Sequence, residues 1–136
     1  MPGAQAAQDA LSVLEGQSLF EGPEHRVSVR LAGHDGKIYL DLTNENWEAV
    51  EITKQGWRLV AEPTPKFRRS KGMLAIPAPA SGGNLRLLRQ FVNVSDGDWP
   101  LVLAWLVAAL RDTGPYPVMV LNGEHGSAKS TTERVL

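Results

Sequence analysis

The sequence contains no cysteine, which excludes disulfide bonds and thiolate metal sites. Because disulfides are rare in reducing compartments, this absence agrees with a cytoplasmic location. Residues 1–8 lack the basic stretch and apolar core of a signal peptide. The longest apolar stretch, residues 99–110, is shorter than the roughly 20 residues that a membrane-spanning helix needs. We therefore expect a buried helix there and no membrane partner.

Acidic residues are absent from residues 63–95, although the whole chain has a net charge of only -1. The bases of this segment are Lys66, Arg68, Arg69, Lys71, Arg86 and Arg89. The first four surround Phe67, an aromatic ring that can stack on a nucleobase, and this pattern predicts a contact with single-stranded DNA. The alternative is a solvated hairpin edge, on which basic side chains discourage pairing with further strands.

Alternating apolar and polar residues predict an antiparallel β-rich module over residues 21–80. Residues 26–42 predict a first hairpin around the turn at 33–36, and residues 47–60 predict a second around 54–56. Prolines follow the second hairpin and interrupt the sheet, because proline cannot donate a hydrogen bond to a ladder.

Short strands are also expected at residues 66–69 and 73–76, before a linker rich in proline and glycine at 77–83. Trp47 and Trp57 fall within paired strands. We expect both rings to pack on one face as core, with sugar or base binding as the alternative.

The amino end predicts a helix over residues 5–15 that stops at Gly16, inside an N-terminal helical segment of residues 1–20. Residues 85–91 predict a helical turn or a short helix.

The apolar stretch near residue 100 predicts a longer helix that runs to Arg111. Asp98 is its expected N-cap, and Gly114 lies where such a helix ends. Trp99 and Trp105 are expected in the core.

After this helix the sequence predicts a strand, a glycine-rich loop and a helix start, which is the order of elements in a phosphate-binding site. An apolar run at residues 117–121 predicts a buried strand. The loop that follows reads Gly123-Glu124-His125-Gly126-Ser127-Ala128-Lys129-Ser130-Thr131. Consecutive backbone N–H groups of such a loop donate to phosphate oxygens. Lys129 is expected to reach the β- and γ-phosphates, and the Ser130 hydroxyl is expected to coordinate Mg²⁺. The sequence thus predicts a Walker A site for ATP.

Ala128 departs from the Walker A pattern, which has glycine before the lysine. The alanine methyl is costly only where the backbone needs a positive φ or a close approach, and Gly126 supplies part of the flexibility. The alternative is a glycine-rich turn that precedes a helix by coincidence. His125 is expected to face solvent, and Glu124 is not expected to act as a general base.

The stretch from Pro115 to Thr131 resembles the ATPases of phage- and plasmid-type primase–helicases, relatives of superfamily 3 and AAA+ helicases. A similar loop with alanine in the position of Ala128 occurs in them. Upstream, residues 38–42, 50–53 and 67–69 resemble the β-rich region that precedes their ATPase core.

The resemblance implies an ATP-dependent motor that unwinds or remodels DNA during replication and assembles as a homo-oligomeric ring. The family's Walker B carboxylates, sensor and arginine finger have no counterpart before Leu136. We therefore expect an N-terminal part of such a protein that does not hydrolyse ATP alone. The predicted fold class is α+β, with the antiparallel β-rich module followed by the linker and the first helix, strand and loop of an incomplete P-loop NTPase domain at residues 81–136.

Two other functions remain open. One is a non-enzymatic β-rich module that binds single-stranded DNA or a replication partner. The other is a small nucleotide-binding adaptor that is complete as it stands.

Overall fold

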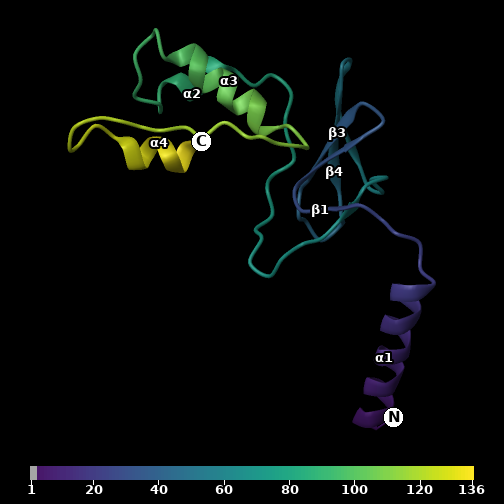
Figure 1. The fold of residues 1–136 in the computed structure, drawn as a ribbon. Coiled ribbons are helices and arrows are strands. Elements are labelled where there is room, and N and C mark those ends of the chain that lie inside the picture. The colour runs from purple at the N-terminus through teal and green to yellow at the C-terminus, as the bar shows by residue number, and fades with distance from the viewer. Residues whose placement is uncertain (1–2) are drawn as a thin grey trace.

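The computed structural model describes residues 3–136, which form a mixed α+β fold (Figure 1). In chain order the elements are α1 (Ala4–Phe20), β1 (Val27–Ser28), β2 (Leu31–His34), β3 (Lys37–Asp41), β4 (Ala49–Thr53), β5 (Gly56–Val60), β6 (Lys66–Phe67), α2 (Leu85–Arg89), α3 (Trp99–Ala109) and α4 (Lys129–Val135). Helix α1 stands apart on one side of the strands, whereas α2, α3 and α4 gather on the other (Figure 1). The predicted α+β class is confirmed.

The main sheet is antiparallel with the order β2-β3-β4-β5, so the predicted hairpin turns both form. Asp35 and Gly36 join β2 to β3, and their φ values of 50° and 71° are those of a tight two-residue hairpin turn. The register places Leu31 opposite Leu40 in the first hairpin. It thereby sets apolar residues of neighbouring strands on a shared face.

The buried apolar residues of the sheet and its flanking turn are Ala32, Tyr39, Leu42, Ala49 and Val50. A buried carboxylate, that of Glu51, lies beside them on β4. It accepts hydrogen bonds from the Tyr39 hydroxyl at 2.8 Å, the Arg58 Nε at 2.6 Å and the Lys37 Nζ at 3.1 Å.

Tyr39 and Arg58 lie directly opposite Glu51 on the two neighbouring strands, so this polar set crosses three strands. The hydrogen bond from Arg58, followed by those from Tyr39 and Lys37, lowers the pKa of Glu51 to about 2. The carboxylate is therefore charged, and fully paired, at neutral pH.

The beginning of the first predicted hairpin is wrong. Val27 and Ser28 form β1, which pairs in parallel with β6 as a separate two-stranded sheet. The Arg68 N–H extends this pairing by donating to the Ser28 carbonyl at 2.8 Å. Val27 and Val29 are exposed, so their alternation with polar residues does not mark a buried face. Residues 66–68 therefore occupy the edge of residues 27–28 that the predicted hairpin would have used for its own pairing.

Two further expectations about this module are wrong. Residues 73–76 form no strand. The Ile76 N–H instead donates to the Leu42 carbonyl at 3.0 Å. Trp47 and Trp57 are not core, because they are 53% and 44% exposed. Trp47 precedes β4 in a turn with a φ of 57°, which removes it from the alternation of the strand.

Helix α1 passes the predicted stop at Gly16 and ends at Phe20. A glycine inside a helix costs only about 1 kcal/mol relative to alanine, and the neighbouring alanine and leucine residues favour the helix. Helix α2 confirms the predicted short helix, and the Asn84 Oδ1 caps it by accepting the Arg86 N–H at 2.9 Å.

Asp98 stands at the expected N-cap position of α3, but the capping hydrogen bond from its side chain is absent. Asp98 precedes α3 in the αR conformation and its side chain caps nothing. Instead, the Ser95 Oγ accepts the Asp98 N–H at 3.1 Å and donates to the Asp98 carboxylate at 2.7 Å. The serine therefore satisfies a free donor at this helix start.

Helix α3 buries Val102 alone, and Trp99 and Trp105 are only half-buried, so their expected place in a core is wrong. Residues 117–121 cover one side of the helix, and its other side faces solvent. Among residues 3–136, no helix combines the length and apolar character needed to cross a membrane.

The pairing of Glu51 predicts acid sensitivity of the sheet. Because its pKa falls from 4.5 to about 2 on folding, its ion pairs stabilise the fold fully above about pH 4.5, and this contribution is lost as the pH falls towards 2. We expect the free energy of unfolding, measured by urea titration, to decrease most steeply in that window. Glu51→Gln should flatten the decrease, whereas Glu62→Gln, at an exposed carboxylate, should preserve it. An unchanged acid profile in Glu51→Gln would contradict this role.

Candidate functional site

Lys129, the first residue of α4, turns its side chain back into the loop that precedes the helix. Its Nζ donates to the carbonyl oxygens of Gly123 at 2.9 Å and Glu124 at 2.7 Å, and to the Ser127 Oγ at 3.2 Å. The ammonium group therefore lies inside the curve of the loop.

The loop curls because two of its residues have left-handed backbone conformations, with φ of 82° at Gly126 and 61° at Ala128. A left-handed conformation costs an L-residue such as alanine roughly 1–2 kcal/mol, whereas glycine adopts it freely. Ala128 thus stands at a position where a glycine would relieve strain. At Gly123 the constraint is different, because a Cβ there would lie 2.5 Å from the Ser127 Oγ and would displace that side chain.

The remaining loop residues differ in exposure. Glu124 and His125 are exposed, which confirms the expected solvent-facing position of the histidine. Ser130 and Thr131 are also exposed on the first turn of α4, whereas Thr132 is buried. The Ser130 side chain is therefore open to solvent.

Asn93 supports the loop from a distant part of the chain. Its Nδ2 donates to the Ser127 carbonyl at 3.1 Å. A single asparagine between two helices belongs to no motif, so the sequence carries no signal for this role.

The buried strand expected at residues 117–121 is wrong. This segment forms no ladder with the strands described for residues 3–136, and Val118 and Val120 are 87% and 70% exposed. It lies instead beside α3, where the Trp105 Nε1 donates to the Pro117 carbonyl at 2.9 Å. The apolar sequence favours a strand, but a strand is buried only when neighbouring strands cover it.

A groove of about 850 Å³ lies between α3 and this segment. Leu101 and Trp105 line it from the helix, residues 117–121 line it from the other side, and Lys129 lines it where it meets the loop. Within the described part of the chain, the loop and its following helix are therefore present without a sheet that carries them.

The five candidate DNA-contacting residues separate into two groups. Lys66, Arg68 and Lys71 are exposed, and Phe67 is half-buried. Arg69 points inward, and its side chain is 13% exposed.

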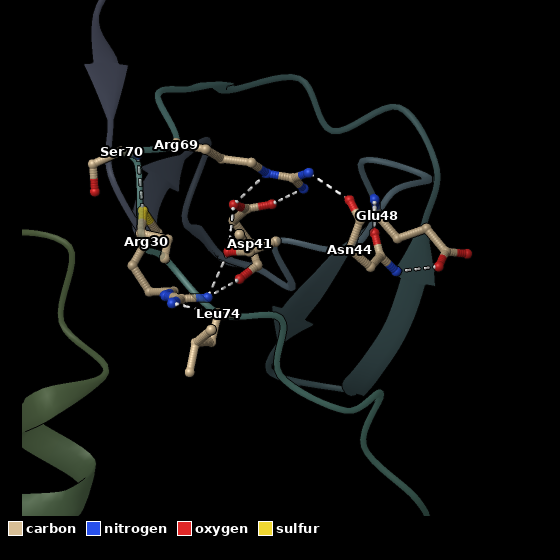
Figure 2. A network of polar contacts seen from close by, with 9 residues as sticks. Arg30, Asp41, Asn44, Glu48, Arg69, Ser70 and Leu74 are labelled. Carbon is tan, nitrogen blue, oxygen red and sulfur yellow. Dashed lines mark hydrogen bonds and ion pairs between the residues drawn. The ribbon is translucent and has the colours of Figure 1, made fainter.

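Arg69 binds the buried carboxylate of Asp41, which is 1% exposed (Figure 2). Its Nε donates to the Asp41 Oδ2 at 2.9 Å, its Nη2 donates to the Oδ1, and its Nη1 donates to the Asn44 carbonyl. The guanidinium also lies 3.9 Å from the centroid of the Trp47 ring. Arg69 therefore belongs to the interior of the module and is not available to a ligand.

Arg30 contacts the backbone of Asp41 rather than its carboxylate (Figure 2). Its Nη1 donates to the Asp41 backbone carbonyl at 3.2 Å and to the Thr43 Oγ1 at 2.6 Å, and its Nη2 donates to the Leu74 carbonyl at 3.3 Å. Burial alone would raise the pKa of Asp41, but hydrogen bonds from the Arg69 side chain and the Thr43 backbone outweigh it and lower the pKa.

The described residues hold no group of three or more His, Cys, Asp or Glu side chains suited to a metal ion. No protein-family model, curated protein or solved structure matches the chain. The resemblance of the loop to primase–helicase ATPases therefore stays a prediction.

The Asp41–Arg69 pair predicts a large difference between two adjacent arginines. Removing one partner of a buried ion pair leaves the other charge unpaired, so Arg69→Ala is expected to lower the free energy of unfolding by about 3 kcal/mol. Arg68→Ala, at the exposed neighbour, is expected to change it by less than about 0.5 kcal/mol. Urea denaturation at neutral pH measures both. Equal effects of the two substitutions would contradict the assignment of Arg69 to the interior.

Proposed function

We propose that residues 123–131 bind the phosphates of ATP together with Mg²⁺, in a protein related to the primase–helicase ATPases of mobile elements. The observation that carries the proposal is the position of Lys129. Its ammonium group is held inside the loop by the Gly123 and Glu124 carbonyls. An entering phosphate has only to replace these two bonds with charge-assisted ones, which are stronger.

The left-handed residues of the loop support the same proposal. Positive φ values at Gly126 and Ala128 are the kind of backbone that turns successive N–H groups towards one side. Such a concave set of donors, with a lysine beside it, suits the concentrated negative charge of a triphosphate. The exposure of Ser130 next to Lys129 supports coordination of Mg²⁺ by its hydroxyl, as the Walker A pattern expects.

The proposal concerns binding and does not include hydrolysis. Hydrolysis needs a second group on Mg²⁺ and a residue that orients the attacking water. Neither is assigned to a residue of this chain.

Equilibrium titration with a fluorescent ATP analogue and Mg²⁺ tests the proposal. Hydrogen bonds to charged groups contribute about 1.5–3 kcal/mol, so Lys129→Ala is expected to raise the dissociation constant about tenfold or more. Arg134→Ala, at an exposed base in the last turn of the same helix, is the matched control and should leave it unchanged. Ala128→Gly should bind at least as tightly as the unmodified chain, because it relieves the left-handed strain. Equal binding by Lys129→Ala and the unmodified chain would refute the proposal.

A second candidate function is binding of single-stranded DNA by the β-rich module. The observation that favours it is the shared exposure of Lys66, Arg68 and Lys71 around β6, with the half-buried Phe67 between them. Three cations on one short stretch match a phosphate backbone, and an aromatic ring matches its bases.

Titration of labelled single strands at several salt concentrations measures this activity. If the three cations contact phosphates, the slope of log K against log salt is about -2. Lys66→Ala combined with Lys71→Ala should bring the slope close to about -0.7 without changing the fold. Lys54→Ala, at an exposed base in the β4–β5 turn, is the control. Binding that is absent or insensitive to salt would remove this candidate.

A further inference from the structure

The groove between α3 and residues 117–121 is continuous with the loop at 123–131. Ser127 and Lys129 belong to the loop and also line the groove, and the buried Thr132 lines it from α4. The groove volume of about 850 Å³ falls within the range of about 300–1,000 Å³ that is typical of small-molecule sites. A ligand held by the loop therefore has a recess of suitable size beside it.

The walls of the groove are mainly apolar. Leu101, Ala104 and Trp105 contribute to the wall on α3, and residues 118–121 form the wall opposite. Among the described residues that line the groove, the charged ones are Lys129, where it meets the loop, and Asp98. Away from Lys129 the groove therefore offers no cation to a second anionic group, and it suits an uncharged, apolar part of a ligand.

Polar groups without partners are also present along the groove. The Pro117 carbonyl accepts the Trp105 Nε1 hydrogen bond, but the backbone groups of residues 118–122 take part in none of the hydrogen bonds found within residues 3–136. An extended backbone carries both N–H donors and C=O acceptors. The amide side chains of Asn93 and Asn122, which also line the groove, are donors and acceptors as well.

We infer that this groove binds the base of the nucleotide whose phosphates occupy the loop, an inference that rests on the proposed function. A nucleobase is uncharged, apolar on its two faces and polar along its edge, and the groove combines apolar walls with a few hydrogen-bonding groups. Trp105 supplies an aromatic surface for the base. Because the ribose tethers the base to the phosphates, the base has to lie close to Lys129, where loop and groove meet. The site therefore selects nucleotides over inorganic polyphosphates.

Isothermal titration calorimetry of the full chain with Mg²⁺-ATP and with magnesium tripolyphosphate tests this selection. Tripolyphosphate presents the phosphates of ATP without the base and ribose. ATP is expected to bind about tenfold more tightly, because stacking and apolar burial of a base contribute that much.

A substitution that fills the groove tests the location of the base. Ala104 is exposed and lines the groove, so Ala104→Phe should bring the affinity for ATP down to that for tripolyphosphate and leave the latter unchanged. Val107→Phe, at an exposed residue of α3 outside the lining, is the matched control and should change neither affinity. Leu101→Ala is a smaller change in the lining that should weaken ATP binding alone. Circular dichroism of each variant shows whether the fold is retained.

Lys129→Ala separates this inference from the proposed function, because it should weaken both ligands alike. Equal affinities for ATP and tripolyphosphate, both dependent on Lys129, would mean that the loop binds phosphates while the groove does not bind the base. Failure of both ligands to bind would refute the proposed function and the base site together. Undiminished ATP binding by Ala104→Phe would overturn the base site and leave the groove to another occupant, such as an apolar segment of a protein.

Discussion

The ion pair between Asp41 and Arg69 is the interaction on which the β-rich module depends, because it joins segments that the sheet does not connect. Asp41 ends β3, and Arg69 follows β6 much later in the chain. Arg30 extends the network to Thr43 and to the returning backbone at Leu74. Strand pairing builds the sheet, and this network holds the connecting segments around it. Since both charges are largely buried, loss of one partner leaves the other charge without compensation.

The same network gives the basic segment two different surfaces. Arg69 is directed inward by Asp41, whereas Lys66, Arg68 and Lys71 remain in solvent. The acidic α1 lies on the other side of the sheet from α2 (Figure 1). Regions of opposite charge are thus separated in the structure. The net charge of -1 does not show this separation, because the opposite charges cancel in the sum.

Local patterns in the sequence predicted the parts of the fold that are local in space. The hairpin turn at Asp35 and Gly36 and the short helix α2 were predictable because a few neighbouring residues determine each of them. The pairing of β1 with β6 could not be predicted in this way, because residues distant in the chain compete for the same strand edge. At the candidate site, Lys129 and its loop follow from a motif. The support from Asn93 comes from outside the motif, and residues 117–121 lack the ladder that would make them a strand.

We propose that the loop ending in Lys129 receives nucleotide phosphates. Backbone amide NMR of the isotope-labelled full chain, titrated with ATP and Mg²⁺, tests it at the level of single residues. We expect the N–H resonances of residues 123–131 to move together and saturate, while those of β3 and β4 stay in place. Unchanged resonances at 123–131 under saturating ATP, or changes confined to the sheet, would contradict it.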